Sequence, residues 1–239
     1  MKTIVLTGDS RGLGNTITRT LLESDYRVIG LSRRQPQNFE ALKSQHGDDY
    51  VHLEFDLSSP EKIEDLYKDK LKPEGPLDGL VNNAALAHDD LVTNAEAEGL
   101  ETLFQVNVIS PILLTKRLIR DMLLHRENGS IVHVSSVSAR KGFRGLSLYA
   151  STKGALESFS RGVAREWGER DIRSNCVAPG FMETDMTGTL SEDQKEQIYN
   201  RTSLGEAVDP ESVAESVEFL LSDKASSITG EVLNVDAGA

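Results

Sequence analysis

The sequence predicts an α/β fold: a single doubly wound domain on a seven-stranded parallel sheet, with helices on both faces. Short apolar runs of strand length alternate with longer segments of helical period, a pattern typical of parallel strands joined by crossover helices. The apolar runs lack polar alternation, which suits strands covered on both faces. A chain of 239 residues is long enough for one large domain, so we expect residues 1–239 to form a single unit.

Seven apolar runs are the candidate strands, at 4–6, 28–31, 50–55, 77–81, 130–134, 174–177 and 232–235. The first helix is expected directly after the first strand, because Leu13, Ile17 and Leu21 repeat at helical spacing. Further helical segments are expected at 38–46, 60–70, 95–125, 148–168 and 210–222.

Composition and charge narrow the class of protein. The net charge of −12 would repel a phosphate backbone, so we expect no nucleic-acid partner. No stretch approaches the roughly 20 apolar residues of a membrane helix, so we expect no membrane insertion. The first residues do not resemble a signal peptide. Cys176 is the one cysteine, which excludes an intrachain disulfide and favours a reducing, cytoplasmic location.

Two irregular stretches, 138–147 and 181–207, follow predicted strands at the carboxyl edge of the sheet. Open α/β sheets bind ligands at this edge. The second stretch is long for a connection, so we interpret 181–207 as a substrate lid with a short helix at 191–199.

A glycine-rich turn, Thr-Gly-Asp-Ser-Arg-Gly-Leu-Gly at 7–14, joins the first strand to the first helix. Gly8 allows a tight turn, Gly12 leaves room for backbone amides to approach a pyrophosphate, and Gly14 allows close helix packing. The start of the helix presents free N–H groups to an anion. Three glycines can simply shape a turn, but this position favours a dinucleotide site that also includes Ser10, Arg11 and Leu13.

Tyr149 and Lys153 lie four residues apart in a predicted helix, which places both side chains on one face. An ammonium beside a phenol favours the phenolate and lowers the phenol pKa from about 10. Tyr149 would then exchange protons near neutral pH. The same spacing occurs on ordinary exposed helix faces, so its meaning depends on the surrounding residues.

These motifs together resemble those of the short-chain dehydrogenase/reductase family over essentially the whole chain. The glycine turn has the spacing of that family, Ser136 ends a predicted strand thirteen positions before Tyr149, and Asn107 lies in the fourth predicted helix. The resemblance implies a Rossmann-type fold and a catalytic tetrad of Asn107, Ser136, Tyr149 and Lys153.

The resemblance implies interconversion of a carbonyl and an alcohol. Ser136 would hydrogen-bond the substrate oxygen, and Tyr149 would protonate that oxygen as hydride arrives from the nicotinamide. Lys153 would lower the tyrosine pKa and bind the nicotinamide ribose. Asn107 would support a water chain that resupplies the proton.

Three neighbouring residues have other interpretations. Ser135 and Ser138 are alternatives to Ser136, although the spacing favours Ser136. His133 is expected to be a packed core histidine, because no histidine or cysteine constellation indicates a metal site.

At the end of the second predicted strand, many NAD enzymes carry an acidic side chain that holds the ribose hydroxyls. Here Ser32 takes that place, followed by Arg33 and Arg34, with Arg11 nearby in the glycine turn. Arginine suits a 2′-phosphate, which a carboxylate would repel. Arg33 and Arg34 are also compatible with a solvated loop, but the pattern favours NADP(H) over NAD(H).

The resemblance assigns further cofactor contacts. Asp56 and Leu57 match the adenine contact of the family, and 82–85 matches its Asn-Asn-Ala-Gly motif, with alanine in place of the last glycine. The remaining expected contacts are Asn83, Ala84, Ala85, Pro179, Gly180, Met182 and Thr184, together with Tyr149 and Lys153.

Within the family, the sequence is most similar to the 3-oxoacyl-[acyl-carrier-protein] reductase branch. That branch docks an acidic carrier protein partly through two arginines; Arg170 matches one, whereas Glu127 replaces the other, beside Arg126. The resemblance implies a homotetramer or homodimer, although Ala239 ends the sequence without the apolar tail that these reductases carry into a subunit interface.

Arg140, Lys141 and Arg144 form a basic cluster before Tyr149, which either receives an anionic substrate or carrier arm or is a solvated loop. Three functions stay open. They are an NADPH-dependent reductase of carrier-bound or small 3-oxoacyl thioesters, a relative acting on another ketone, sugar, polyol or secondary-metabolite intermediate, and a non-catalytic dinucleotide sensor. The intact tetrad argues against the sensor.

Overall fold

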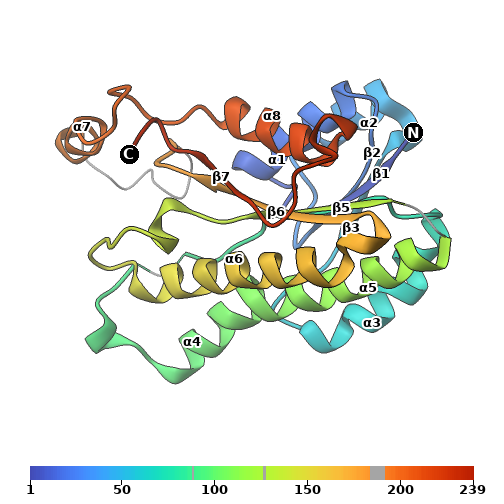
Figure 1. The fold of residues 1–239 in the computed structure, drawn as a ribbon, viewed down its shortest axis with the longest axis horizontal. Coiled ribbons are helices and arrows are strands. Elements are labelled where there is room, and N and C mark those ends of the chain that lie inside the picture. The colour runs from blue at the N-terminus through green and yellow to red at the C-terminus, as the bar shows by residue number, and fades with distance from the viewer. Residues whose placement is uncertain (88, 126–127, 184–191) are drawn as a thin grey trace.

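The computed structural model describes residues 1–87, 89–125, 128–183 and 192–239. At its centre lies a seven-stranded sheet in the order β3-β2-β1-β4-β5-β6-β7, with every neighbouring pair parallel (Figure 1). The strands are β1 Thr3–Thr7, β2 Arg27–Ser32, β3 Tyr50–Glu54, β4 Gly79–Asn82, β5 Gly129–Val134, β6 Ile172–Pro179 and β7 Val232–Val235. The predicted seven-stranded parallel sheet is confirmed.

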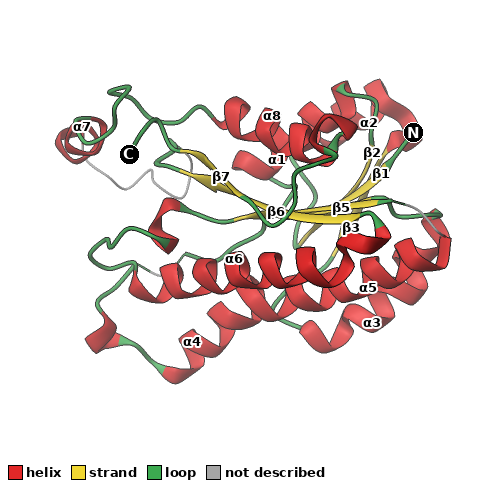
Figure 2. Cartoon of the chain, viewed as in Figure 1, coloured by secondary structure: helices red, strands yellow, loops and turns green. Residues whose placement is uncertain are grey.

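Helices cover both faces of this sheet (Figure 2). One face carries α1 Gly12–Glu23, α2 Phe39–His46 and α8 Pro210–Leu221, and the other carries α3 Ile63–Leu66, α4 Ala97–Phe104, α5 Ser110–His125 and α6 Ser147–Trp167. Successive strand residues point to opposite faces, so Val28 joins the core under α1 and α8 while Ile29 joins the core on the other side.

Two predicted helices contain irregular turns. The segment predicted at 95–125 consists of α4, a π-helical turn at Gln105–Ile109, and α5. The segment predicted at 60–70 begins as a 3₁₀ turn at Pro60–Lys62, continues as α3, and ends in a π-helical turn at Tyr67–Leu71. Such turns are frequent at functional sites, and the turn at Gln105–Ile109 includes Asn107.

The carboxyl ends of the strands lie at one end of the molecule, on the left of Figure 1. The start of α6, the helix α7 Glu192–Tyr199 and the C-terminus all lie at this end. The strand order reverses between β1 and β4, because β2 and β3 extend to one side and β5, β6 and β7 to the other. Doubly wound sheets bind ligands at such a switch point.

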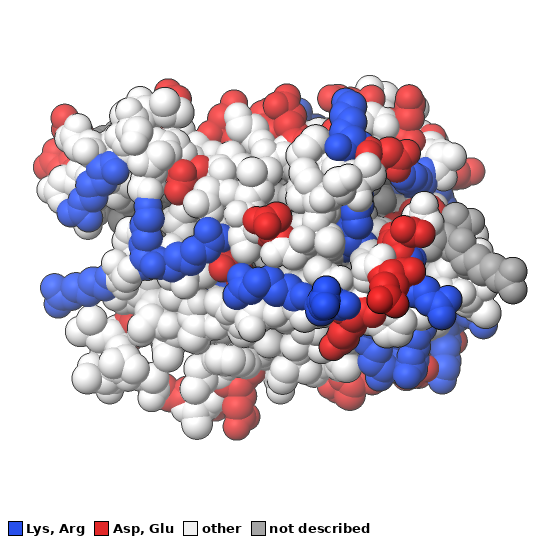
Figure 3. Space-filling model, viewed as in Figure 1, with Lys and Arg blue, Asp and Glu red and all other residues white. Residues whose placement is uncertain are grey.

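The surface mixes charges unevenly. On the face shown in Figure 3, Lys and Arg side chains form a row across the middle, over α6, although the net charge of the chain is −12. Arg161 and Arg165, both in α6, are exposed. Within the described ranges, no helix is both long and apolar enough to cross a membrane.

Candidate active site

Ser136, Tyr149 and Lys153 meet at the carboxyl end of β5. Ser136 follows β5 closely, and the other two residues lie one turn apart on α6. The side chain of Ser136 hydrogen-bonds the hydroxyl of Tyr149. Lys153 Nζ lies 5.5 Å from the centroid of the Tyr149 ring and donates to the carbonyl oxygen of Val134 at 2.7 Å. The structure therefore brings three of the predicted catalytic side chains into one cluster.

Burial dominates the pKa values in this cluster. It raises the pKa of Tyr149 to about 12, against a smaller lowering by the hydrogen bond with Ser136. Burial also lowers the pKa of Lys153 to about 8. The predicted lowering of the Tyr149 pKa by Lys153 is not found, because the ammonium lies beside the ring and is bound to Val134. Tyr149 is thus a protonated phenol at neutral pH.

Asn107 is fully buried in the π-helical turn, and its side chain is held by protein atoms. Nδ2 donates to the carbonyl of Leu86 at 2.9 Å and to Thr152 Oγ1 at 3.1 Å, and Oδ1 accepts from the N–H of Leu86 at 2.8 Å. Asn107 therefore fastens the loop after β4 to α6. Both amide hydrogens have protein acceptors, so the predicted water chain can use only the oxygen of this side chain.

The serines beside Ser136 have partners of their own. Ser135 Oγ donates to Oε1 of the buried Glu157 at 2.8 Å. Ser138 Oγ donates to Ser136 Oγ at 3.0 Å. Of the three candidates, Ser136 is the one whose side chain contacts Tyr149.

The predicted basic cluster is divided by an ion pair. Arg140 donates to both carboxylate oxygens of Glu157, at 3.1 and 3.2 Å, and to Asn234 Oδ1 at 3.0 Å. Lys141 and Arg144 are exposed. Arg140 therefore ties the loop before α6 to the helix and to β7, although its side chain is still partly exposed.

Two glycines determine the backbone shape of the glycine-rich turn. A Cβ on Gly14 would lie 1.9 Å from the carbonyl oxygen of Gly8, so only glycine lets α1 start this close to β1. Gly12 has a φ of +52° and nothing within 4 Å of where a Cβ would lie. The first turn of α1 carries no acidic residue and no side-chain cap. Uncapped N–H groups at a helix start attract anions, so the turn fits a dinucleotide pyrophosphate.

The other predicted residues of this turn differ in exposure. Arg11 is exposed and Ser10 partly buried, whereas Leu13 packs into the core under α1. A contact between Leu13 and a cofactor would therefore use its backbone N–H.

The loop after β4 is tied to the glycine turn. Asn83 Nδ2 donates to the carbonyl oxygens of Thr7 at 3.0 Å and Gly8 at 3.3 Å. The backbone N–H groups of Asn83 and Ala84 both donate to Thr7 Oγ1 at 3.0 Å. Asn83 and Ala84 therefore position the turn, and Ala85 follows them, partly buried.

Asp56 and Leu57 lie beyond β3. Asp56 Oδ1 accepts from the backbone N–H of Ser58 at 2.9 Å, and this bond, helped by the charge of Arg33, lowers the Asp56 pKa. Leu57 is buried, and its carbonyl accepts from Ser110 Oγ at 2.6 Å. Asp56 is exposed and thus available to the predicted adenine contact.

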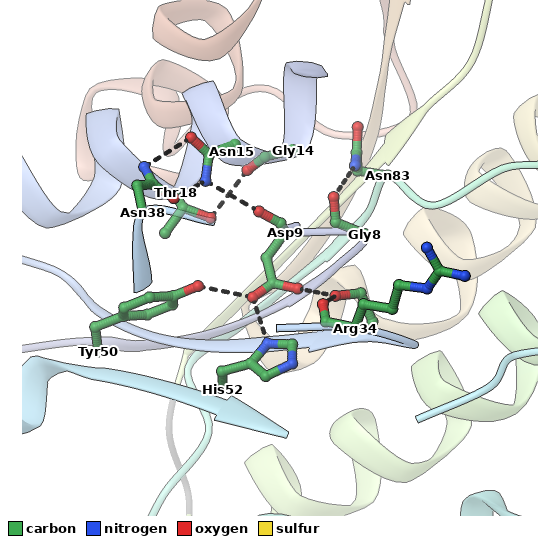
Figure 4. A network of polar contacts seen from close by, with 11 residues as sticks. Gly8, Asp9, Gly14, Asn15, Thr18, Arg34, Asn38, Tyr50, His52 and Asn83 are labelled. Carbon is green, nitrogen blue, oxygen red and sulfur yellow. Dashed lines mark hydrogen bonds and ion pairs between the residues drawn. The ribbon is translucent and has the colours of Figure 1, made fainter. Parts of the chain in front are cut away.

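A buried carboxylate lies behind the end of β2 (Figure 4). Asp9, from the glycine turn, is fully buried, and its Oδ1 accepts from Ser32 Oγ at 2.6 Å. Its Oδ2 accepts from the hydroxyl of Tyr50 and from His52 Nδ1, both at 2.8 Å. The sequence predicted no carboxylate at the end of β2. The structure places one there, from the glycine turn. Arg33 and Arg34, just after β2, are exposed.

The segment after β6 is packed against the C-terminal strand. Pro179 is buried, and the N–H of Gly180 donates to the carbonyl of Val235 at 2.9 Å. Met182 packs against the core under α1 and α8. Thr184, the last predicted cofactor contact, lies outside the described residues.

The described part of 181–207 folds back on itself. The rings of Phe181 and Tyr199 lie 6.0 Å apart, and Lys195 Nζ lies 3.6 Å from Glu183 Oε2. The predicted helix at 191–199 is present as α7, with residue 191 outside the described ranges. Whether 181–207 closes over a substrate stays a prediction.

His133 is a core histidine, as predicted. It is fully buried, stacks edge-on against Phe159 with centroids 5.7 Å apart, and lies 3.1 Å from the amide of Asn82. Burial lowers the pKa of His133 to about 3, so the ring is neutral. Among the described residues, no group of three or more His, Cys, Asp or Glu side chains is placed to hold a metal ion.

Comparison with known proteins gives this geometry a family. A family model described as enoyl-(acyl carrier protein) reductase matches residues 8–239. Carbonyl reductase family member 4 of Xenopus tropicalis is 37% identical over 239 residues, which cover 99% of this chain and 97% of the relative. The chain belongs to the short-chain dehydrogenase/reductase family.

Two further matches agree with this assignment. A 3-oxoacyl-[acyl-carrier-protein] reductase of Vibrio cholerae is 35% identical, over 99% of this chain and 96% of the relative. The solved structure of ElxO with NADP bound superposes with a TM-score of 0.89 at 27% identity, covering 99% of this chain and 98% of the other. As a short-chain dehydrogenase/reductase, the protein is an oxidoreductase that uses a nicotinamide dinucleotide on carbonyl and alcohol groups.

Sequence reasoning missed three residues that shape the site of this short-chain dehydrogenase/reductase. Asp9 was counted only as part of the glycine turn, and Gly30 only as part of a strand. Glu157 was not singled out, although an acidic residue four positions after Lys153 on an apolar helix face is a signal. A glycine inside a predicted strand was the signal for Gly30.

Proposed function

We propose that this protein is an NADPH-dependent reductase of 3-oxoacyl thioesters, which it converts to the 3-hydroxyacyl form. The observation that carries the reaction type is the cluster of Ser136, Tyr149 and Lys153, in which the phenol is protonated and ready to donate. The substrate class is supported by the full-length similarity to the reductase of Vibrio cholerae, whose name specifies a 3-oxoacyl substrate.

The residues of the cluster divide the work. A bound NADPH supplies hydride to the carbonyl carbon. The hydroxyl of Ser136 holds the substrate oxygen by a hydrogen bond, next to the hydroxyl of Tyr149. Tyr149 gives its proton to that oxygen as negative charge develops there. The Lys153 ammonium, held by Val134 beside the Tyr149 ring, is the group that would bind the nicotinamide ribose.

Three exposed cations support NADPH as the preferred reductant. Arg33 and Arg34 follow β2, and Arg11 lies in the glycine turn, so all three border the place where a dinucleotide carries its adenine ribose. Arginine binds a phosphate through paired hydrogen bonds. The binding geometry of the turn, with α1 uncapped, suits the pyrophosphate of either dinucleotide.

The test is oxidation of NADPH with a short 3-oxoacyl thioester, run in parallel with NADH and with the Tyr149→Phe variant. We expect turnover that prefers NADPH and requires Tyr149. Tight NADPH binding without thioester turnover would contradict the substrate class. Normal turnover by Tyr149→Phe would contradict the mechanism.

A second substrate class is supported by the similarity to carbonyl reductase family member 4. The engagement of Arg140 with Glu157 reduces the cationic surface that an anionic carrier arm would contact. A panel of ketones, sugars and polyols assayed under the same conditions distinguishes this class, because it shares the catalytic residues and differs in the loops.

We also propose that the protein is a homo-oligomer in the cytoplasm. A groove of about 400 Å³ on α4 and the π-helical turn is lined by Leu100, Phe104 and Ile109, and Leu124 on α5 is 65% exposed. Light scattering on the purified protein measures the number of copies.

The residues considered for carrier docking are only partly described. Arg170 is exposed and follows the C-terminal end of α6, whereas Tyr149 lies near the N-terminal end of that helix. Glu127 and Arg126 lie outside the described residues.

A further inference from the structure

The carboxylate of Asp9 fills the space that the missing side chain of Gly30 leaves on β2. A Cβ on Gly30 would lie 2.0 Å from Asp9 Oδ2, so β2 leaves out a side chain where the carboxylate lies. Gly30, Ser32, Tyr50 and His52 share one face of the sheet, because Gly30 pairs with His52 and side chains alternate along each strand. The carboxylate of Asp9 therefore lies against side chains of both β2 and β3 (Figure 4).

The carboxylate of Asp9 has hydrogen-bond partners inside the fold. Tyr50 is a donor because burial, and then the charge of Asp9, raises the pKa of its phenol. His52 Nδ1 donates to the same oxygen, Oδ2. The backbone carbonyl of Asp9 accepts from Asn15 Nδ2 at 3.3 Å, and Asn15 and Asn38 exchange a reciprocal pair of hydrogen bonds. Buried carboxylates persist when they are satisfied in this way.

Ser32 connects this buried charge to the surface. A serine hydroxyl has one proton and two lone pairs. The two acceptors within reach of the Ser32 proton are Asp9 Oδ1 at 2.6 Å and the carbonyl of Arg34 at 3.0 Å, both protein atoms. The lone pairs of Ser32 are therefore what this residue offers to a ligand at the end of β2.

The 2′ group of an adenine ribose binds at the end of β2 in doubly wound folds. A 2′-hydroxyl of NADH can donate to the lone pairs of Ser32. A 2′-phosphate of NADPH accepts but does not donate, and its charge has the same sign as Asp9. The exposed Arg33 and Arg34 attract the phosphate. The negative charge of Asp9 and the positive charges of the two arginines therefore have opposite effects on NADPH binding.

We propose that Asp9 is a specificity-determining residue that acts through Ser32 to favour the ribose 2′-hydroxyl, and so narrows the preference for NADPH over NADH. This inference rests on the dinucleotide binding of the proposed function. It assigns to Asp9 a role beyond holding the glycine turn. The ratio of the affinities for NADPH and NADH would then depend on two opposing effects, that of the buried Asp9 carboxylate and that of the exposed arginines.

The test is direct binding of NADPH and of NADH, followed by nicotinamide fluorescence, to the wild type and to Asp9→Asn. Asparagine keeps the shape and can still pair with Ser32, Tyr50 and His52, so the fold has partners for it. We expect the ratio of the Kd for NADH to the Kd for NADPH to rise about tenfold in Asp9→Asn, which equals about 1.4 kcal/mol. Ser32→Ala should shift the ratio in the same direction, and the double variant by less than the sum.

Tyr50→Phe is the matched control, because it removes a donor to Asp9 Oδ2 and keeps the charge. A purely structural network would make Tyr50→Phe behave like Asp9→Asn, and the inference requires the Tyr50→Phe ratio to stay within about twofold of the wild type. An unchanged ratio of the two Kd values in Asp9→Asn would overturn this inference and leave the proposed function unaffected. Failure of the wild type to bind either dinucleotide overturns the inference together with the cofactor of the proposed function.

Discussion

The two ends of the candidate dinucleotide site are assembled differently. At the catalytic end, Tyr149 and Lys153 share one helix, and their spacing alone places them on one face. At the ribose end, Asp9 and Ser32 meet from the glycine turn and β2, and their partners come from β3. A local pattern can be recognised in a sequence, whereas a cluster drawn from three segments exists only once the sheet has its register.

Burial also affects the ionisable groups at the two ends differently. At the catalytic end, burial keeps Tyr149 protonated and brings the pKa of Lys153 to about 8. At the ribose end, a fully buried carboxylate is matched by three donors. The catalytic end is thus poised to transfer a proton, and the ribose end to hold a fixed charge. Variants at each end should therefore change different quantities.

The largest effect is expected from Tyr149→Phe. Loss of the proton donor should lower kcat by about 10²- to 10⁴-fold, while the Kd for NADPH changes little because the ribose end is intact. Single-turnover rates and fluorescence titration measure the two quantities separately. A comparable loss of NADPH affinity would show that the two ends do not act independently.

Gly30→Ala should disturb the ribose end selectively. The added Cβ would lie 2.0 Å from Asp9 Oδ2, so the carboxylate or β2 must shift. We expect a loss of about 1–3 kcal/mol in the free energy of unfolding and weaker NADPH binding, with kcat at saturating NADPH nearly unchanged. Urea unfolding and titration measure these effects.

Gly162→Ala is the control for this variant, since nothing lies within 4 Å of its Cβ position on the exposed face of α6. It should leave stability unchanged or raise it by up to about 1 kcal/mol. A Gly30→Ala variant as stable as Gly162→Ala would mean that the Asp9 cluster is not tightly packed.

The pH dependence should report Lys153. Its pKa in the folded protein is lowered to about 8, so the ammonium is present below pH 8 and lost above it, whereas Tyr149, with a pKa of about 12, stays protonated. We expect kcat/KM for carbonyl reduction to fall up to about tenfold per pH unit above pH 8. A decline that begins only near pH 10 would assign it to another group.

The same shift has a consequence for stability. Between pH 8 and about 10.5, the unfolded chain holds a proton on Lys153 that the folded protein has released. This group alone therefore raises the free energy of unfolding as the pH rises through that range. Chemical denaturation at pH 8 and pH 10, compared with Lys153→Met, measures this contribution.

The smallest effect is expected at the basic cluster. Arg144→Glu should raise the KM for an anionic thioester by about two- to fivefold, because an exposed charge contributes little. Arg140→Gln is the comparison variant: it should leave this KM nearly unchanged and lower stability, because the buried Glu157 loses its ionic partner. Equal KM changes in both variants would show that Arg140 also faces the substrate.

The parts of the site that are formed by neighbouring residues were largely predictable. The spacing of Gly8, Gly12 and Gly14 predicted the turn, and the spacing of Tyr149 and Lys153 predicted their common helix face. The direction of the Tyr149 pKa was not predictable, because it depends on how deeply the fold buries the phenol. The π-helical turn at Asn107 was missed for a related reason, since one extra residue in a helical turn leaves the apolar period almost unchanged.

By itself, the sequence determined the succession of strands and helices along the chain, the parallel sheet and the catalytic motif. Hydrophobic period and short spacings are properties of neighbouring residues. Only the tertiary structure decided which side chains lie against Asp9, which serine contacts Tyr149, and that Arg140 is bound to Glu157. Those contacts join residues that are 13 to 43 positions apart. The register of the sheet and the burial that follows from packing set them, and neither is a property of any single segment.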